Sequence, residues 1–408
     1  MKDLLLTRIH LLIALFAVLF LISCDNGDDP VTKTNQYYLS NEIQDSISKE
    51  EALATFTQIS PEAIFIGGFI KHDVEIQKLV YKTTFKDQNI QASGLVCLPK
   101  TPGNYPVLSF QNGTKTLHSE APTVAFDDDL YKMIESIASM GFIVTIADNI
   151  GFGESSNIPH PYLDAKSSTQ CILDLLRAEK ELEAEENTVA KSTKDLFIFG
   201  YSLGGWATMQ VQKSIEKNYA SEFNLIASSC GAGPYSLEYM NNYILGLETY
   251  PMPYFLAYLL NSYQILGSFN NPMSDFFQEP YAAKIPGLFD GEHAGGTINA
   301  ALNTQLPVLL SPVYRSEYAT GSKFEQQRMA LTANSIVAWK TTTPTKLFHG
   351  EMDDYIPFSI SEKMFSDFRT KGVPETQIEL ILIPGADHTT GVYETGLKTI
   401  LWFLSLKK

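Results

Sequence analysis

The most constraining feature of the sequence is a serine held between two glycines, in Gly200-Tyr201-Ser202-Leu203-Gly204. A continuously apolar run, residues 196–199, stands directly before it, which is typical of a strand buried on both faces of a parallel sheet. Small residues follow it, so a helix can begin immediately behind the serine. A strand, a tight turn and a helix in this order lift the serine hydroxyl out of the sheet and direct a helix N-terminus at it. We therefore predict that Ser202 is a nucleophile.

Length and charge bound the fold and the partners of the chain. Its 408 residues are enough for one large domain or two ordinary ones, and a composition of 44% hydrophobic and 19% charged residues is typical of a globular protein. The formal net charge of -16 disfavours nucleic acid, and an anionic membrane surface, as the main partner.

The first 23 residues are predicted to be an export signal outside the fold. Lys2 and Arg8 precede an apolar run over residues 9–22, which is too short and wrongly flanked for a spanning helix. The run ends in Leu21-Ile22-Ser23-Cys24, which resembles a bacterial lipoprotein signal with cleavage before Cys24 and lipid on its sulfur. Residues 24–36 would then be a flexible tether. The alternative is an ordinary signal peptide with an incidental cysteine. We expect an exported lipoprotein, in the periplasm or on the outer membrane or cell surface.

The remaining cysteines give no sign of a metal site or a disulfide framework. Cys97, Cys171 and Cys230 are scattered through apolar contexts, without the spacing of metal ligands. We expect them to be small buried side chains.

Most of the chain alternates between strand-like and helix-like segments. Strands are predicted over residues 74–85 and 90–98, joined as a hairpin, and over residues 105–110, 142–147, 196–199, 225–233, 345–350 and 377–384. Helices are predicted over residues 52–56, 128–140, 166–186 and 390–406. A hairpin followed by this alternation predicts an α/β fold with a mostly parallel sheet flanked by helices.

One long block interrupts the alternation. Residues 236–343 are rich in aromatic residues and contain nothing that alternates like a strand. We predict a mainly helical cap here, inserted late in the sheet between a first core part, residues 37–235, and a last core part, residues 344–408. An apolar insertion at this edge favours contact with substrate, although a second structural layer without that role is the alternative.

Candidate catalytic residues follow the predicted strands in the order Ser202, Asp353 and His388. A serine needs a base to take its proton, and the base needs an acid that holds it in one tautomer. Since ligands of parallel sheets bind beyond the carboxyl ends of the strands, we expect these side chains to face one crevice. Asp354 is the alternative acid, but the Gly-x-x-Asp spacing favours Asp353.

These motifs resemble those of the α/β-hydrolase superfamily: Gly200-Tyr201-Ser202-Leu203-Gly204, Gly350-x-x-Asp353-x-x-Ile356-Pro357 and Gly385-x-x-His388. Within it, the chain is similar to the secretory lipase group, through the long cap and the segment His160-Pro161-Tyr162-Leu163. The superfamily resemblance covers roughly residues 74–406. It implies an α/β-hydrolase fold and acyl transfer through an acyl-serine, without a metal or an organic cofactor.

The resemblance also implies where an oxyanion would be stabilised. The backbone N–H of Leu203 is one expected donor, and the loop after the strand over residues 105–110 supplies the other, with Thr114 preferred and Gly113 beside it. The family usually has His-Gly where this chain has Asn112-Gly113.

Other residues near the expected crevice have less defined roles. His160 and Tyr201 are predicted to contact substrate, and His349 is expected to end a strand. The other histidines have no companion motif: His10, His72, His118 and His293.

The sequence thus predicts a serine carboxylic ester hydrolase, a lipase or esterase, acting on apolar acyl or aromatic esters. One alternative is a peptidase of the prolyl-peptidase type, but the chain has no room for the large domain that precedes the hydrolase in that group. The other is a non-catalytic binding lipoprotein on a hydrolase scaffold, although such scaffolds usually lack one of the three catalytic residues.

Overall fold

The structure, a computed structural model, describes residues 35–59 and 61–408. The predicted signal segment, the lipidation site Cys24 and most of the predicted tether lie outside these residues. The fold below is that of the compact unit Tyr37–Lys408. In the part of the chain that the structure describes, no helix is both long and apolar enough to cross a membrane.

The core of this unit is one mixed sheet, with strands in the order β1-β2-β3-β5-β4-β6-β7-β8-β9. The strands described are β1 (Tyr38–Ile47), β2 (Val74–Phe85), β3 (Gln88–Pro99), β4 (Gly103–Gln111), β5 (Ile143–Ala147), β6 (Ala190–Tyr201), β7 (Asn224–Gly231), β8 (Thr345–Gly350) and β9 (Ile378–Ile383). Strands β1, β2, β3 and β5 pair antiparallel in turn, and all pairs from β5 to β9 are parallel. The predicted mostly parallel α/β sheet is confirmed.

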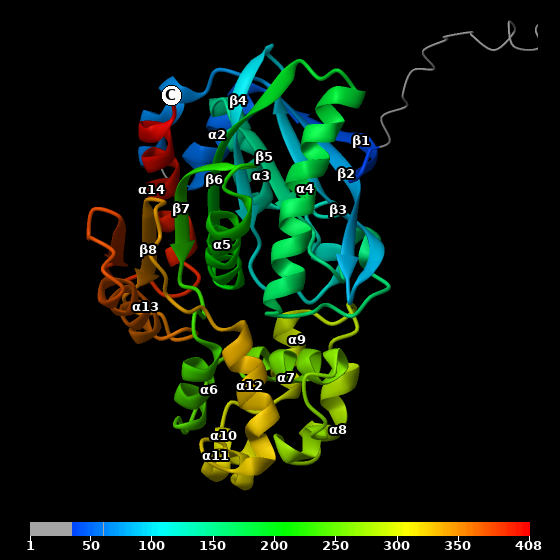
Figure 1. The fold of residues 1–408 in the computed structure, drawn as a ribbon, viewed down its shortest axis with the longest axis vertical. Coiled ribbons are helices and arrows are strands. Elements are labelled where there is room, and N and C mark those ends of the chain that lie inside the picture. The colour runs from blue at the N-terminus through cyan, green and yellow to red at the C-terminus, as the bar shows by residue number, and fades with distance from the viewer. Residues whose placement is uncertain (1–34, 60) are drawn as a thin grey trace, which may run out of the picture. The chain divides into compact units, whose positions relative to one another are not determined.

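Helices cover both faces of the sheet (Figure 1). The helices of the core are α2 (Lys49–Ile59), α3 (Asp129–Ser136), α4 (Ala165–Glu185), α5 (Leu203–Ser214), α13 (Phe358–Thr370) and α14 (Gly391–Leu406). Buried residues of α4, α5 and α13 share one hydrophobic cluster, and those of α2, α3 and α14 share another. Along β6, Leu196 and Ile198 join the first cluster while Phe197 and Phe199 join the second. Because successive side chains of a strand point to opposite faces, this apolar run needs cover on both sides.

Strand β1 was not predicted, because the first strand predicted from the sequence begins at residue 74. It is an edge strand, paired only through β2, and most of its side chains are exposed or partly exposed. Ile43, for example, is 60% exposed. An edge strand held by backbone hydrogen bonds needs no apolar alternation, so the pattern gave no signal.

The hairpin of β2 and β3 turns more tightly than predicted. Phe85 pairs with Gln88, so only Lys86 and Asp87 form the turn, with φ of 48° and 60°. Two central residues with positive φ match the twist of the flanking strands. Strand β3 therefore begins two residues before the predicted position.

The insertion between β7 and β8 is helical and lies beyond the carboxyl ends of the parallel strands (Figure 1). Its helices are α6 (Leu237–Leu245), α7 (Tyr254–Leu266), α8 (Tyr281–Lys284), α9 (Gly295–Ala301), α10 (Leu306–Leu309), α11 (Pro312–Glu317) and α12 (Glu325–Asn334). Two isolated antiparallel bridges, Thr249 with Gln305 and Phe277 with Leu310, are the strand-like pairings described within it. The prediction of a mainly helical cap inserted late in the sheet is confirmed.

Candidate active site

Ser202 occupies the sharp turn between β6 and α5. Its φ of 59° is unusual for a residue with a side chain, and its backbone N–H donates to the Gly231 carbonyl oxygen at 2.9 Å. The two glycines of the motif are needed for close approach. A Cβ on Gly200 would lie 2.3 Å from the Gly204 carbonyl oxygen, and a Cβ on Gly204 would lie 1.9 Å from the Gln111 carbonyl oxygen. The turn can therefore form only with glycine at both positions.

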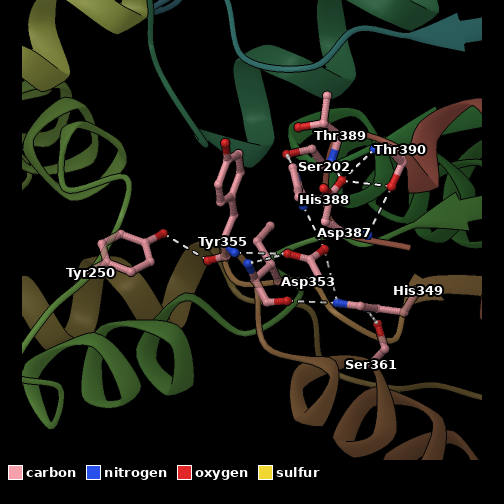
Figure 2. A network of polar contacts seen from close by, with 11 residues as sticks. Ser202, Tyr250, His349, Asp353, Tyr355, Ser361, Asp387, His388, Thr389 and Thr390 are labelled. Carbon is pink, nitrogen blue, oxygen red and sulfur yellow. Dashed lines mark hydrogen bonds and ion pairs between the residues drawn. The ribbon is translucent and has the colours of Figure 1, made fainter. Parts of the chain in front are cut away.

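Loops after β8 and β9 bring an acid and an imidazole to this serine (Figure 2). His388 Nε2 lies 2.9 Å from Ser202 Oγ, and His388 Nδ1 lies 2.7 Å from Asp353 Oδ2. His388 is 8% exposed, and the Asp353 side chain is fully buried. The structure thus brings the three predicted residues into one hydrogen-bonded line.

The loop that carries His388 is held by its own turn. The Asp387 carboxylate accepts hydrogen bonds from the backbone N–H groups of Thr389 and Thr390, at 3.0 and 2.7 Å. The Thr390 hydroxyl also donates to this carboxylate at 2.8 Å (Figure 2). These bonds shape the backbone on either side of the imidazole, and α14 begins directly after it.

The backbone of its own loop orients Asp353. Its Oδ1 accepts hydrogen bonds from the backbone N–H groups of Tyr355 and Ile356, at 3.0 and 2.9 Å. This leaves Oδ2 for His388. The neighbouring Asp354 is exposed and has no part in the network. The geometry therefore favours Asp353 over Asp354 as the acid.

A second histidine contacts the same carboxylate. His349 Nε2 lies 2.8 Å from the Ile356 carbonyl oxygen and 3.4 Å from Asp353 Oδ2, and its Nδ1 lies 2.7 Å from Ser361 Oγ. Because a carbonyl oxygen only accepts, Nε2 carries the proton and Ser361 donates to Nδ1. Burial lowers the pKa of His349, so the ring is neutral at pH 7. His349 ends β8 as expected, but its contact with Asp353 was not predicted; the four-residue spacing in His349-Gly350-Glu351-Met352-Asp353 was the available signal.

A largely apolar pocket contains Ser202. The core supplies Tyr162, Leu163, Ser202, Leu203, Pro234 and Ile356 to its wall. The cap supplies Leu237, Met240, Asn241, Ile244, Tyr250, Phe255, Leu256 and Leu259. Helices α6 and α7 of the cap therefore form much of the wall around Ser202.

The loop after β4 lies against the turn that holds Ser202. A Cβ on Gly204 would lie 2.9 Å from the Asn112 carbonyl oxygen, and the corresponding position on Gly113 is 4.0 Å from the Tyr201 carbonyl oxygen. Asn112 Nδ2 donates to the Ala147 carbonyl oxygen at 2.6 Å, which ties this loop to the end of β5. The segment predicted to supply an oxyanion donor is thus beside the N-terminus of α5.

The predicted oxyanion residues hold different positions in this arrangement. Leu203 is the first residue of α5 and lines the pocket. The Thr114 hydroxyl lies 2.9 Å from the Tyr162 hydroxyl, so the loop is also bonded to a pocket residue.

The two residues predicted to contact substrate are not among those that line this pocket. His160 Nδ1 lies 2.6 Å from the Ile150 carbonyl oxygen, and burial lowers the pKa of this imidazole to about 4. Tyr201 packs its ring 5.2 Å from that of His388. From the segment that carries His160, it is Tyr162 and Leu163 that reach the pocket.

Comparisons with known proteins agree with this fold. Residues 115–263, which include the turn at Ser202 and most of helix α7, match the model of the secretory lipase family. No curated protein matches the sequence.

Solved structures extend the likeness over most of the chain. A protein of Legionella pneumophila described as a candidate hydrolase superimposes with a TM-score of 0.81 at 24% identity, covering 91% of this chain and 98% of that one. The rice cell wall degrading esterase LipA from Xanthomonas oryzae gives 0.75 at 23% identity, covering 91% and 97%. Candida antarctica lipase A in its closed state gives 0.63 at 17% identity, covering 90% and 81%. The fold is that of the α/β-hydrolases, and with the family match the chain is a hydrolase of the carboxylesterase and lipase type.

Proposed function

We propose that this chain is a serine carboxylic ester hydrolase in which Ser202 attacks the ester carbonyl and forms an acyl-serine. The observation that carries the proposal is the hydrogen-bonded line Ser202–His388–Asp353, which opens into the apolar pocket under the cap. The substrate is an ester with an apolar acyl or aromatic part, because the wall of the pocket is mostly aliphatic and aromatic.

The proposed proton path follows from the distances. During attack, Ser202 Oγ gives its proton to His388 Nε2, and the imidazolium then passes it to the leaving alkoxide. Asp353 keeps His388 in the tautomer that has Nδ1 protonated and stabilises the imidazolium. Water attacks the acyl-serine in the second half of the cycle, with His388 again as the base.

The oxyanion is proposed to bind between α5 and the loop after β4. The backbone N–H of Leu203 stands at the helix N-terminus, where the aligned peptide dipoles favour negative charge. The second donor is the N–H of Thr114, or that of Gly113 beside it. No metal and no organic cofactor has a step in this reaction.

The enzyme is proposed to be exported and held at a membrane by lipid on Cys24. The apolar run before Cys24 and the polar segment after it support this proposal, and the similarity to secretory lipases agrees with export.

The test is hydrolysis of p-nitrophenyl esters from acetyl to palmitoyl by the protein that begins at residue 25, beside the variant Ser202→Ala. We expect kcat to fall by at least about 10³-fold in this variant, because the nucleophile is lost. Ser366→Ala, at an exposed serine on α13, is the matched control and should keep full activity. Folded protein that hydrolyses no ester, or activity that survives Ser202→Ala, would overturn the proposal.

A further inference from the structure

One polar atom in the wall of the pocket has no partner. Asn241 of α6 is 1% exposed and lines the pocket that contains Ser202. Its Nδ2 is buried and has no hydrogen-bond partner among the described residues. A buried N–H without an acceptor is costly, so an unpaired amide at a binding site points to a ligand.

The oxygen of this amide, Asn241 Oδ1, accepts a hydrogen bond within the cap. The Tyr314 hydroxyl of α11 lies 2.7 Å from Asn241 Oδ1, and Gln327 Nε2 of α12 donates to the same hydroxyl at 2.6 Å. Since Tyr314 accepts from Gln327, its own proton goes to Asn241 Oδ1. Tyr314 and Gln327 are both fully buried. This chain of bonds within the cap leaves the N–H groups of Asn241 as the free donors.

The other polar side chains of the pocket have partners. The Tyr162 hydroxyl bonds to Thr114 Oγ1, and the Tyr250 hydroxyl donates to the Tyr355 carbonyl oxygen at 2.9 Å. The nucleophile bonds to its base. All other residues of the wall are leucine, isoleucine, methionine, phenylalanine or proline. Among the polar side chains that line the pocket, Asn241 is the one with a buried atom that has no partner among the described residues.

We propose that Asn241 Nδ2 donates a hydrogen bond to an uncharged oxygen, of the ether, ketone or hydroxyl class, in the part of the ester that enters the pocket. The enzyme then selects oxygen-bearing esters over all-carbon esters of the same length. The inference rests on the proposed function and names its substrate class. The acceptor is uncharged because no cationic side chain lines the pocket and its apolar wall would strip an anion of water.

The test compares matched esters that differ by one ether oxygen in place of one methylene. One series moves the oxygen along the acyl chain of p-nitrophenyl octanoate, and a second moves it along the octyl chain of octyl acetate. The quantity measured is the ratio of kcat/KM for the oxygen-bearing ester to that for its all-carbon partner, in the wild type and in Asn241→Leu. Dividing the two ratios removes the intrinsic reactivity of each ester.

We expect at least one oxygen position at which the wild-type ratio exceeds the Asn241→Leu ratio by about 10-fold, the usual worth of one hydrogen bond with a buried partner. The gain should be in the oxygen-bearing ester, while Asn241→Leu hydrolyses the all-carbon ester as well as the wild type or better. Asn242→Leu is the matched control, because Asn242 is the next residue of the same helix and is exposed. It should keep the wild-type ratio.

Each other outcome has a definite meaning. Equal ratios in the wild type and in Asn241→Leu at every position overturn this inference while the proposed function stands. If kcat/KM for both esters falls to the same extent in folded Asn241→Leu, Asn241 has a structural role. This outcome also overturns the inference. Failure of the wild type to hydrolyse either ester instead contradicts the proposed function.

A folding defect would not leave the inference untested. Asn241→Leu deprives the buried Tyr314 hydroxyl of its acceptor, so the double variant Asn241→Leu/Tyr314→Phe provides a second background without that hydroxyl. The wild type can also contradict the inference without any variant. Its kcat/KM values are first corrected for the rate at which hydroxide hydrolyses each ester. If no oxygen-bearing ester then has a higher kcat/KM than its all-carbon partner, the inference is ruled out.

Discussion

The carboxylate of Asp353 accepts from two backbone N–H groups, of Tyr355 and Ile356, and also faces two imidazoles, those of His388 and His349. The two backbone bonds to Oδ1 hold this buried carboxylate in one orientation, with Oδ2 toward His388. The adjacent aspartate, on the exposed side of the loop, has no such surroundings. Two neighbouring residues of the same type therefore differ completely in what they can do.

This difference leads to a prediction for the pair Asp353→Asn and Asp354→Asn. The first variant places an amide against His388 Nδ1 and favours the wrong tautomer, so kcat for ester hydrolysis should fall by about 10³–10⁴-fold. The second changes an exposed side chain, and its kcat should stay within about 2-fold of the wild type. The measurement is the steady-state rate on one p-nitrophenyl ester. A greater loss of kcat in Asp354→Asn than in Asp353→Asn would show that Asp354 is the acid and contradict the assignment of Asp353.

At the scale of single elements, helix α3 contains a buried carboxyl group that its amphipathic pattern does not predict. Glu135 is fully buried on this helix, and neither carboxyl oxygen has a hydrogen-bond partner among the described residues. Burial, reinforced by the nearby Asp45, raises the pKa of Glu135 to about 8. The folded protein therefore holds a proton here that the unfolded chain releases near pH 4.5.

The stability of the protein should consequently fall as the pH rises from about 4.5 to about 8, and change little from this source above that. Between these values the folded state binds one proton more than the unfolded state, so the free energy of unfolding decreases with a limiting slope of about 1.4 kcal/mol per pH unit. We expect Glu135→Gln to remove this part of the slope and to be more stable than the wild type at pH 9. The measurement is the free energy of unfolding of both proteins, from urea unfolding at pH 5, 7 and 9.

The control for this experiment is Glu362→Gln, at an exposed glutamate of α13. It should keep the wild-type dependence on pH. A Glu135→Gln protein whose stability changes with pH as steeply as that of the wild type would show that Glu135 does not titrate in this range.

At the scale of the whole molecule, the proposed anchor and the site are separable. Every residue of the proposed site lies between Asn112 and His388, within the compact unit Tyr37–Lys408. Lipid on Cys24 would change where the enzyme resides and not how its site is built.

We therefore predict that Cys24→Ser, made in the full chain and expressed in a bacterium, moves the protein from the membrane fraction to the soluble fraction. The kcat/KM on a short, water-soluble ester should remain within about 2-fold of that of the detergent-extracted wild type, because the compact unit does not include this residue. Cys230→Ala, which changes a buried free cysteine, should stay in the membrane fraction. Membrane association that persists in Cys24→Ser would argue against lipidation at this residue.

Much of the fold was predictable because burial leaves a periodic pattern in the sequence. The apolar run before Ser202 requires cover on both faces, and the helices that supply it alternate with the strands. Strand β1 escaped prediction since an exposed edge strand, such as the one around Ile43, is held by backbone bonds that any sequence can form. The cap was predicted as a helical block, but its individual helices were not, because many of them are too short to show a period.

The sequence by itself determined the α/β architecture, the turn at Ser202 and the order of the three residues of the proposed catalytic line, because strand periodicity and a glycine-flanked turn are encoded within a few neighbouring positions. Only the tertiary structure decided that His349 contacts Asp353, and that Asn241, a residue of the pocket wall, has an amide nitrogen without a partner in the described part of the chain. Such facts depend on which polar atoms find partners across the fold: Ser202 and His388 are 186 positions apart, and Asn241 and Tyr314 are 73 apart. A local sequence pattern does not predict a hydrogen bond between residues so far apart in the chain. It also does not predict which polar atoms remain without a partner.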